Sequence, residues 1–197
     1  MAQQQIPDPV QIYEAAFRGF RKTLAGVRLG QLNDPTPCTK WNVKALITHN
    51  LKVPGFVQGV FNGDPTDTTL EVSDPLPPEG PVAALDASVA AVVAMVKKPG
   101  ILQKSLATPF GPMTGGQFLF FPFMDLLIHT WDLARATGQD ATLDSKLVEV
   151  CYNGLLPLGD SLSAAPPGEE PAFAKPVPVP ANASLRDKLI ALTGRHP

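Results

Sequence analysis

The sequence has few cysteines and no long apolar run. Its two cysteines, Cys38 and Cys151, lie far apart in the chain, so they give no disulfide framework, and we expect free thiols and a cytoplasmic location. The most apolar central stretch, residues 118–128, contains Pro122 and Asp125 and is well short of the roughly 20 residues that a membrane span needs. The first ten residues lack the charged-then-apolar build of a signal peptide. We therefore expect a soluble protein.

Charge is also scarce and nearly balanced. Charged residues make up 17% of the chain, and 16 basic against 18 acidic residues give a net charge of −2. Without a dense basic run, the chain offers no electrostatic surface for nucleic acid or an anionic membrane. The sequence also lacks a Gly-rich phosphate loop, a Ser nucleophile elbow and zinc-finger cysteine spacing. We expect neither nucleic acid nor membrane as a partner, and a small-molecule substrate instead.

Most of the sequence shows the patterns of α-helices. Apolar residues recur at steps of three and four between N-cap residues and closing glycines, which is typical of amphipathic helices packed around a core. The predicted helices cover residues 8–30, 42–63, 81–97, 114–137, 144–155 and 184–193. No convincing sheet is predicted, although residues 101–110 allow a short extended segment. The pattern predicts an all-α protein, and four substantial helices with long connections indicate a helical bundle.

Proline marks the part of the chain that does not follow this pattern. The chain has 22 prolines, and their density over residues 165–183 predicts an extended surface segment rather than a helix. Residues 184–193 then predict a short C-terminal helix docked on the body. At 197 residues, the length suits one domain over residues 1–197.

A possible metal site stands out in the helix over residues 114–137. Asp125 and His129 lie four residues apart, so they share one helix face inside an otherwise apolar segment. His49 is placed on the apolar face of the helix over residues 42–63. Two imidazoles and one carboxylate form a ligand set that suits zinc, nickel or ferrous iron and leaves a coordination position open. A metal there could acidify a bound water or thiol.

The other interpretation is that these residues are ordinary polar groups of the core. Buried histidines often bond to backbone carbonyls, and Asp125 with His129 could satisfy each other. Spacing alone favours this second interpretation. It is weakened by the scarcity of histidine, since the chain has three, His196 is terminal and the other two fall on inward faces. Nearby, we interpret Asp132 as either a partner of a ligand histidine or a salt-bridge residue, and Trp41 as a staple against the bundle.

Several blocks of sequence resemble one known family. The blocks are TPCTKWNVKALITHN (residues 36–50), FGPMTGG (110–116), MDLLIHTWDLARATGQD (124–140) and the tail from residue 177 to 197. They are similar to short, single-domain relatives of the mycothiol-dependent maleylpyruvate isomerase N-terminal domain, within the DinB/YfiT-like metalloenzyme superfamily. The pairing of W-x-V-x-x-L-x-x-H with H-x-W-D-L-A carries the resemblance.

The resemblance implies a fold, a metal and a cofactor. The fold is an up-and-down four-helix bundle, and the divalent metal, zinc ahead of nickel or iron, is held by His49, Asp125 and His129. Mycothiol or another low-molecular-weight thiol would be the cofactor, and its thiolate would add to an electrophilic substrate. The isomerase has glutamate where this chain has Asp125, and its second domain has no counterpart here. The isomerase activity itself is therefore not carried over.

Two functions follow from these observations. The first is a metal-dependent enzyme of thiol-dependent transferase or isomerase chemistry. The alternative is a non-catalytic helical-bundle module that binds a metal or a small apolar ligand, and a homodimer is compatible with either. Turnover that requires a thiol would separate the two functions.

Overall fold

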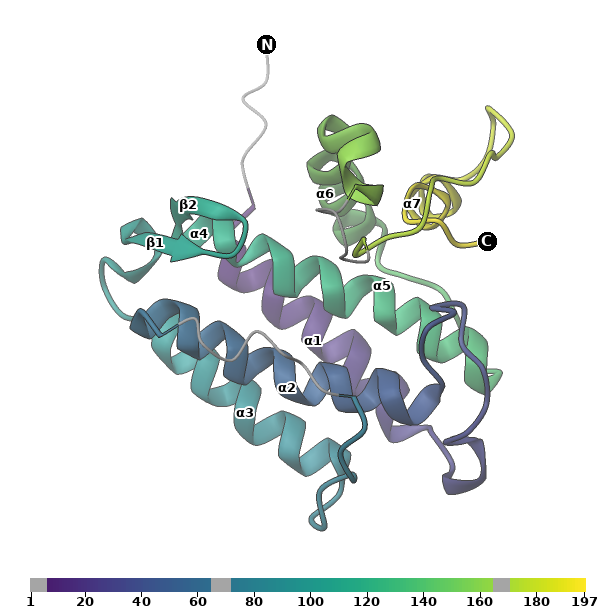
Figure 1. The fold of residues 1–197 in the computed structure, drawn as a ribbon, viewed down its shortest axis with the longest axis horizontal. Helices are drawn as coiled ribbons and strands as arrows, with labels where there is room; N and C mark the ends of the chain where they lie inside the picture. Colours follow the sequence, from purple (N-terminus) through teal and green to yellow (C-terminus); the bar gives the residue numbers. More distant parts are fainter. Residues whose placement is uncertain (1–6, 65–71, 165–170) are drawn as a thin grey trace. The chain divides into compact units, whose positions relative to one another are not determined.

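A computed structural model describes residues 7–64, 72–164 and 171–197 of the chain. These residues form two compact units, one ending at Ala141 and the other beginning at Thr142. The first unit holds α1 (Pro9–Ala25), α2 (Val43–Asn62), α3 (Pro81–Val96), β1 (Ser105–Thr108), β2 (Gly111–Thr114), α4 (Gly115–Phe118) and α5 (Phe120–Thr137); the second holds α6 (Ser145–Leu155) and α7 (Leu185–Leu192) (Figure 1). The organisation into one domain stays a prediction.

Local sequence signals explain where the helices begin and end. The predicted N-caps are confirmed: the Asp8 carboxylate accepts a hydrogen bond from the Val10 amide at 2.8 Å, and Asn42 accepts one from the Ala45 amide at 2.9 Å. Thr114, Asp144 and Ser184 cap their helices in the same way. Such side chains satisfy amides that have no partner in the first turn of a helix.

The predicted helix over residues 114–137 is interrupted. It consists of α4 and α5, with Leu119 between them. We attribute the interruption to Pro122, which has no amide hydrogen to donate to the carbonyl of Phe118. The capping box of Thr114 and Gln117 nevertheless opens α4 as predicted, and Gly138, at a φ of 69°, ends α5.

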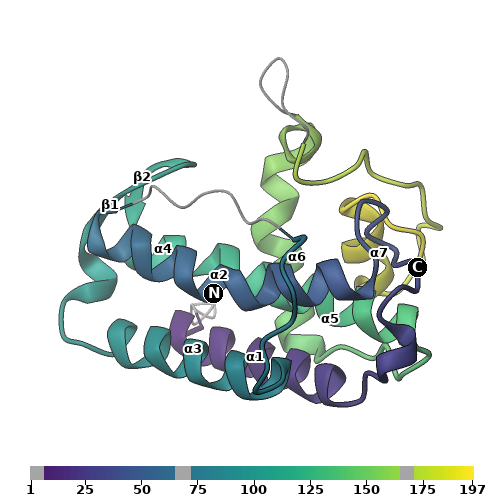
Figure 2. The same cartoon turned by 60° about the horizontal axis from the view of Figure 1, so that its bottom comes forward.

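Helix α3 packs on α1 with the opposite chain direction (Figures 1 and 2). Arg21 Nε lies 2.6 Å from Asp86 Oδ1, and Lys97 Nζ lies 2.7 Å from Glu14 Oε1. From the first pair to the second, the residue number rises along α3 and falls along α1. The two helices are therefore antiparallel.

Helix α5 packs on α1 with the same chain direction. Thr130 Cγ2 lies 4.0 Å from where a Cβ on Gly19 would stand, and Pro9 Cγ lies 3.8 Å from the equivalent point on Gly116, just before α5. From the contact at Pro9 to the contact at Gly19, the residue number rises along both chain segments. The first and last long helices of this unit are thus parallel neighbours.

Helix α2 packs on α3 and α5 and runs antiparallel to α5. His49 Nε2 meets Asp125 Oδ1 at 3.0 Å, whereas Phe61, nearer the end of α2, meets Phe118 with ring centroids 5.9 Å apart. Helices α2 and α3 therefore share one direction, and the predicted up-and-down alternation is wrong. The connection between Asn62 and Pro81 is long enough in sequence to return the chain to the other end before α3 begins, so α3 need not reverse α2.

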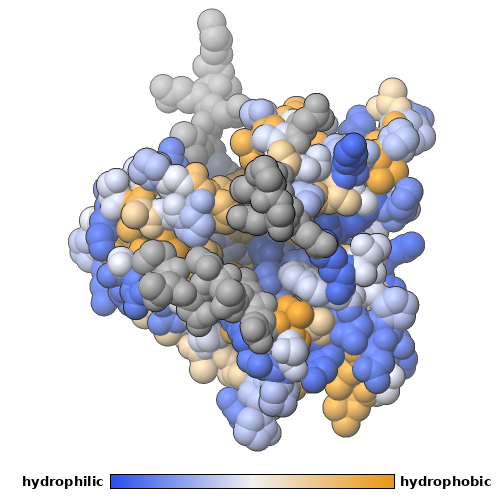
Figure 3. Space-filling model, viewed as in Figure 1, coloured by the Kyte–Doolittle hydropathy of each residue, from blue (hydrophilic) through white to orange (hydrophobic). Residues whose placement is uncertain are grey.

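The regular structure of the described residues is helical apart from a small hairpin, which corrects the prediction of an all-α fold. Strands β1 and β2 pair antiparallel, with Leu106 opposite Met113 and Thr108 opposite Gly111. Strands of four residues are too short to show the alternation that marks a strand in sequence. Phe110 at the turn is 56% exposed, and its ring stacks on Phe121 at 4.4 Å. Hydrophobic residues gather around this hairpin on the face shown in Figure 3.

The second unit is built on α6 and α7, which pack together. The segment before α7 is tied to it by the amide of Val177, which donates to the carbonyl of Ala191 at 2.9 Å. Residues 171–183 contain no regular element, as the prolines predict, whereas residues 165–170 of the predicted extended segment lie outside the described residues. Within the described residues, no helix combines the length and apolar character needed to cross a membrane.

Candidate metal centre

Helices α2 and α5 bring the three predicted ligands together. His49 Nε2 lies 3.0 Å from Asp125 Oδ1, and His129 Nε2 lies 3.3 Å from the same oxygen. Across the three residues, one potential ligand atom each lies within 4.8 Å of the other two. The geometry thus places two imidazole nitrogens and a carboxylate around one point, as the resemblance implied. Ligation of a metal by these residues stays a prediction.

The three side chains lie where α2 packs on α5 rather than at the surface. His49 and His129 are 8% and 6% exposed, while the Asp125 side chain keeps 22% of its surface accessible. The helical spacing of Asp125 and His129 places them on one face of α5, and the antiparallel packing of α2 supplies His49 across from them. The accessible edge of Asp125 gives the site a route to solvent.

Asp132 holds the ring of His129 from the far side. Its Oδ2 lies 2.9 Å from His129 Nδ1, and Asp132 is fully buried. We assign the Nδ1 proton to this bond, because the carboxylate is an acceptor. When Nε2 gives up its own proton, its lone pair is free for a ligand, an arrangement common behind metal-bound histidines. The structure supports the first of the two predicted roles of Asp132.

Burial and charge act against each other at Asp125 and His129. Burial opposes the charge of Asp125, but His49 and His129 outweigh it and hold the pKa of this carboxyl well below its usual range. Burial likewise opposes the charge of His129, but Asp125 first and then Asp132 outweigh it and raise the pKa of the imidazole to about 9. The pair is therefore charged near neutral pH, and a cation that takes this place must displace a proton.

Trp41 forms one wall of the site, which the sequence analysis did not foresee. Its ring centroid lies 4.4 Å from that of His49 and 5.4 Å from that of His129. The position of Trp41 directly before the N-cap Asn42 was the available signal, but it gave no direction for the ring. The indole limits the movement of both imidazoles and provides an apolar surface beside them.

Two polar atoms of the site are left without a partner in the described part of the chain. His49 Nδ1 and Asp125 Oδ2 are buried and have no hydrogen-bond partner within the described residues. A buried carboxylate oxygen without a partner is costly unless a cation or donor compensates it. The donor set of two imidazoles and a carboxylate suits zinc or a neighbouring transition metal. The residues present therefore fit the group that the resemblance implied.

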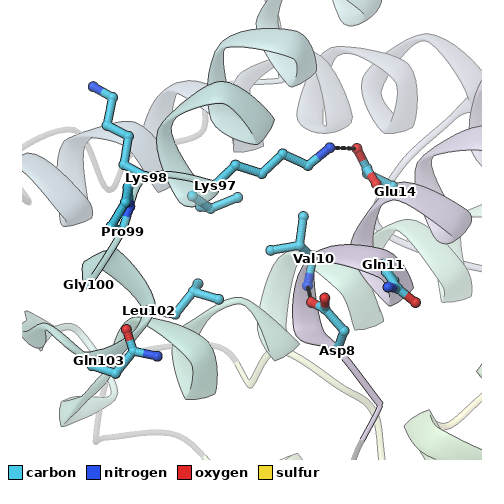
Figure 4. A pocket seen from close by; sticks show the side chains of 11 residues that line it. Asp8, Val10, Gln11, Glu14, Lys97, Lys98, Pro99, Gly100, Leu102 and Gln103 are labelled. Carbon is cyan, nitrogen blue, oxygen red and sulfur yellow. Dashed lines mark hydrogen bonds and ion pairs between the residues drawn. The ribbon is translucent and has the colours of Figure 1, made fainter.

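A separate pocket lies near the start of α1 and the end of α3 (Figure 4). It has a volume of about 490 Å³, and the ion pair of Lys97 with Glu14 spans part of it. None of the three predicted metal ligands lines it. Its charged groups neutralise each other, so we assign it no part in the chemistry of the site.

Comparison with known proteins points to one family. Residues 13–134 match the mycothiol maleylpyruvate isomerase N-terminal domain. The uncharacterized proteins Rv0738 and MT0763, from two strains of Mycobacterium tuberculosis, are each 34% identical over 190 residues, which covers 95% of this chain and 98% of theirs. The matched segment contains all three predicted ligands.

Solved structures of the mycothiol-dependent maleylpyruvate isomerase share the fold. A histidine-to-alanine variant of that enzyme gives a TM-score of 0.62 at 14% identity, over 82% of this chain and 73% of the enzyme. The enzyme without that change gives 0.59 at 14% identity, over 81% and 71%. At this identity the likeness supports a common fold, not a common activity.

Proposed function

This chain belongs to the mycothiol maleylpyruvate isomerase N-terminal domain family, a branch of the DinB-like superfamily, and on that premise we propose that it is a divalent-metal-binding enzyme of thiol-dependent transferase or isomerase chemistry. The observation that carries the proposal is the convergence of His49, Asp125 and His129, whose ligand atoms lie within 4.8 Å of one another. His49, Asp125 and His129 would hold the divalent ion, which would lower the pKa of a thiol or water bound to it.

The protein's own residues supply orientation and access. Asp132 fixes the tautomer of His129, and the ring of Trp41 packs on both imidazoles. Preorganised ligands and a rigid wall keep the site in a productive geometry. The partly accessible carboxylate of Asp125 leaves one side on which a small substrate can approach.

The bundle, the cofactor and the metal complete the proposal. We infer that α1, α2, α3 and α5 constitute the four-helix bundle expected for the family, in the order of directions described above. The printed name of the related isomerase supports a low-molecular-weight thiol of the mycothiol type as cofactor. The ligand set supports zinc ahead of nickel or iron. We keep the cytoplasmic location, the small-molecule substrate and the homodimer as proposals.

Metal content of the purified protein tests the site. Elemental analysis of untagged protein should find about one zinc, nickel or iron per chain, and His49→Ala should lose it while far-ultraviolet circular dichroism stays helical. His196→Ala is the matched control, since it removes a histidine that is distant in sequence from the ligands and should leave the metal in place. Full metal occupancy in His49→Ala would contradict the ligand set.

Turnover separates the enzyme from the alternative function. The metal-loaded protein should convert an electrophilic substrate in the presence of a thiol and not in its absence. Tight metal binding with no thiol-dependent turnover across varied electrophiles would instead favour a non-catalytic binding module. No metal even after reconstitution would mean that His49, Asp125 and His129 are polar residues of the core.

A further inference from the structure

Unpartnered polar atoms extend beyond the proposed metal ligands. Four side-chain atoms are buried without a hydrogen-bond partner in the described part of the chain: Tyr13 Oη, His49 Nδ1, Asn50 Oδ1 and Asp125 Oδ2. Tyr13 is the one of these four whose hydroxyl can donate to an anionic oxygen such as Asp125 Oδ2, and it is fully buried. A tyrosine hydroxyl in the core without an acceptor needs an explanation.

The register of α1 on α5 places Tyr13 level with Asp125. The two helices are parallel, and Gly19 faces Thr130 at 4.0 Å. Both helices rise by the same distance per residue. Tyr13 precedes Gly19 in α1 by the same number of residues as Met124 precedes Thr130 in α5. Tyr13 is therefore level with Met124, the immediate neighbour of Asp125.

The faces of α1 show where the Tyr13 ring is directed. Glu14 and Arg21 pair with α3, whereas Gly19 contacts α5. Tyr13 lies between these two faces, on the same stripe as Phe20, and both rings are fully buried. Its side chain therefore enters the interior of the bundle, where Asp125 and His49 also meet.

Electrostatics agrees with this placement. Burial raises the pKa of Tyr13 far above its ordinary value, and the charge of Asp125 raises it further. The phenol therefore keeps its proton near neutral pH and remains a hydrogen-bond donor there. Asn50 offers another unpartnered buried oxygen, but it carries no charge that would influence Tyr13 in this way.

We propose that Tyr13 is a positioning residue of the metal centre, whose hydroxyl donates a hydrogen bond to Asp125 Oδ2. Oδ1 already faces the two imidazoles at 3.0 and 3.3 Å, so Oδ2 is the oxygen left for another partner. Both atoms lack a partner in the described structure, and we expect the bond to form once Oδ1 is committed to a metal. The hydrogen bond fixes the plane of the carboxylate, as outer partners of metal ligands commonly do. This inference rests on the proposed metal site.

Tyr13→Phe tests the bond, because it removes the hydroxyl and keeps the ring. Titration of the metal-free protein with Co²⁺ and Zn²⁺ should still reach about one metal per chain, with a Kd weakened about 10- to 100-fold. The visible spectrum of bound Co²⁺ should shift, because the carboxylate is no longer held. Tyr152→Phe is the matched control: it changes the other tyrosine of the chain, on α6, and should leave both Kd and spectrum as in the wild type.

A double-mutant cycle separates positioning from general loosening of the core. In an Asp125→Asn background, which removes the charged acceptor, Tyr13→Phe should cost little further affinity. An equal loss in both backgrounds would overturn the proposal, as would an unchanged Kd and Co²⁺ spectrum in Tyr13→Phe while the wild type binds metal. Failure of the wild type to bind any metal would instead refute the proposed function.

A second measurement avoids the Tyr13→Phe variant, in case that variant does not fold. The Tyr152→Phe chain contains Tyr13 as its remaining tyrosine, so labelling with carbon-13 at Cζ gives one tyrosine resonance. This resonance should move on addition of Zn²⁺, because the hydroxyl gains its acceptor. A resonance that stays in place while zinc binds would overturn the proposal.

Discussion

His129 is the residue on which the electrostatics of the site depends most. It contacts Asp125 through Nε2 at 3.3 Å and Asp132 through Nδ1 at 2.9 Å. Two carboxylates on opposite edges of one ring stabilise its protonated form and leave no neutral tautomer that satisfies both. A metal can replace the proton at Nε2 while Asp132 keeps the other nitrogen in place.

The metal-free protein should therefore lose stability in alkaline solution. The folded-state pKa of His129 is raised from 6.5 to about 9, so its stabilisation is fully present below pH 6.5 and disappears as the pH rises through about 9. Urea denaturation in the presence of a chelator should show the midpoint falling over this range. In His129→Gln that fall should be smaller; an equal fall in both proteins would contradict this assignment of the proton.

At the scale of elements, the close packing around Gly115 determines which residue can stand at that position. Gly115 opens α4 where the short 3-10 helix Ile101–Gln103 and the end of α2 converge. A Cβ there would stand 2.6 Å from the Ile101 carbonyl oxygen and 2.7 Å from Phe61 Cε1. Backbone and a buried ring cannot both move aside, so only glycine fits.

Gly115→Ala should destabilise the protein by about 1–3 kcal/mol through overpacking. Gly55→Ala is the matched control: nothing lies within 4 Å of its Cβ position within the described structure, and it is an exposed position inside α2. That change should be neutral or stabilise by about 0.5–1 kcal/mol through helix propensity. Chemical denaturation measures both, and equal effects would refute the packing argument.

Most elements follow from local signals, whereas their arrangement does not. Caps such as Asp8 and Asn42 act within a few residues, so the sequence predicts the helix starts. The spacing of Asp125 and His129 predicts that they share a face. His49 is 76 residues from Asp125; its place on the apolar face of another helix made it a candidate, and the family resemblance then linked it to the pair.

The features that the sequence did not predict are non-local. The common direction of α2 and α3 depends on the path of a long connection, whose length allows either direction. The rings of Trp41 and Tyr13 look like ordinary core residues until the helices around them are placed. Propensity and periodicity carry no information on such contacts, because these signals describe single elements.

At the scale of the whole molecule, the three proposed ligands all belong to the first unit. A ligand that binds only the folded site stabilises it by about 2.7 kcal/mol when its concentration is 100 times the Kd. Zinc should thus slow hydrogen exchange in α2 and α5 more than in α6 and α7. Mass spectrometry of exchanged full-length protein measures this contrast, and His49→Ala should abolish it. Equal slowing in both units would contradict the assignment.

The parallel contact of α1 with α5 also bears on the synthesis of the protein. A chain that leaves the ribosome with its N-terminus first exposes the inward face of α1, including Tyr13 and Phe20, long before α5 exists to cover it. Both rings are fully buried in the finished fold. The first unit therefore cannot complete its core, nor the proposed metal site, until nearly all of that unit has been made.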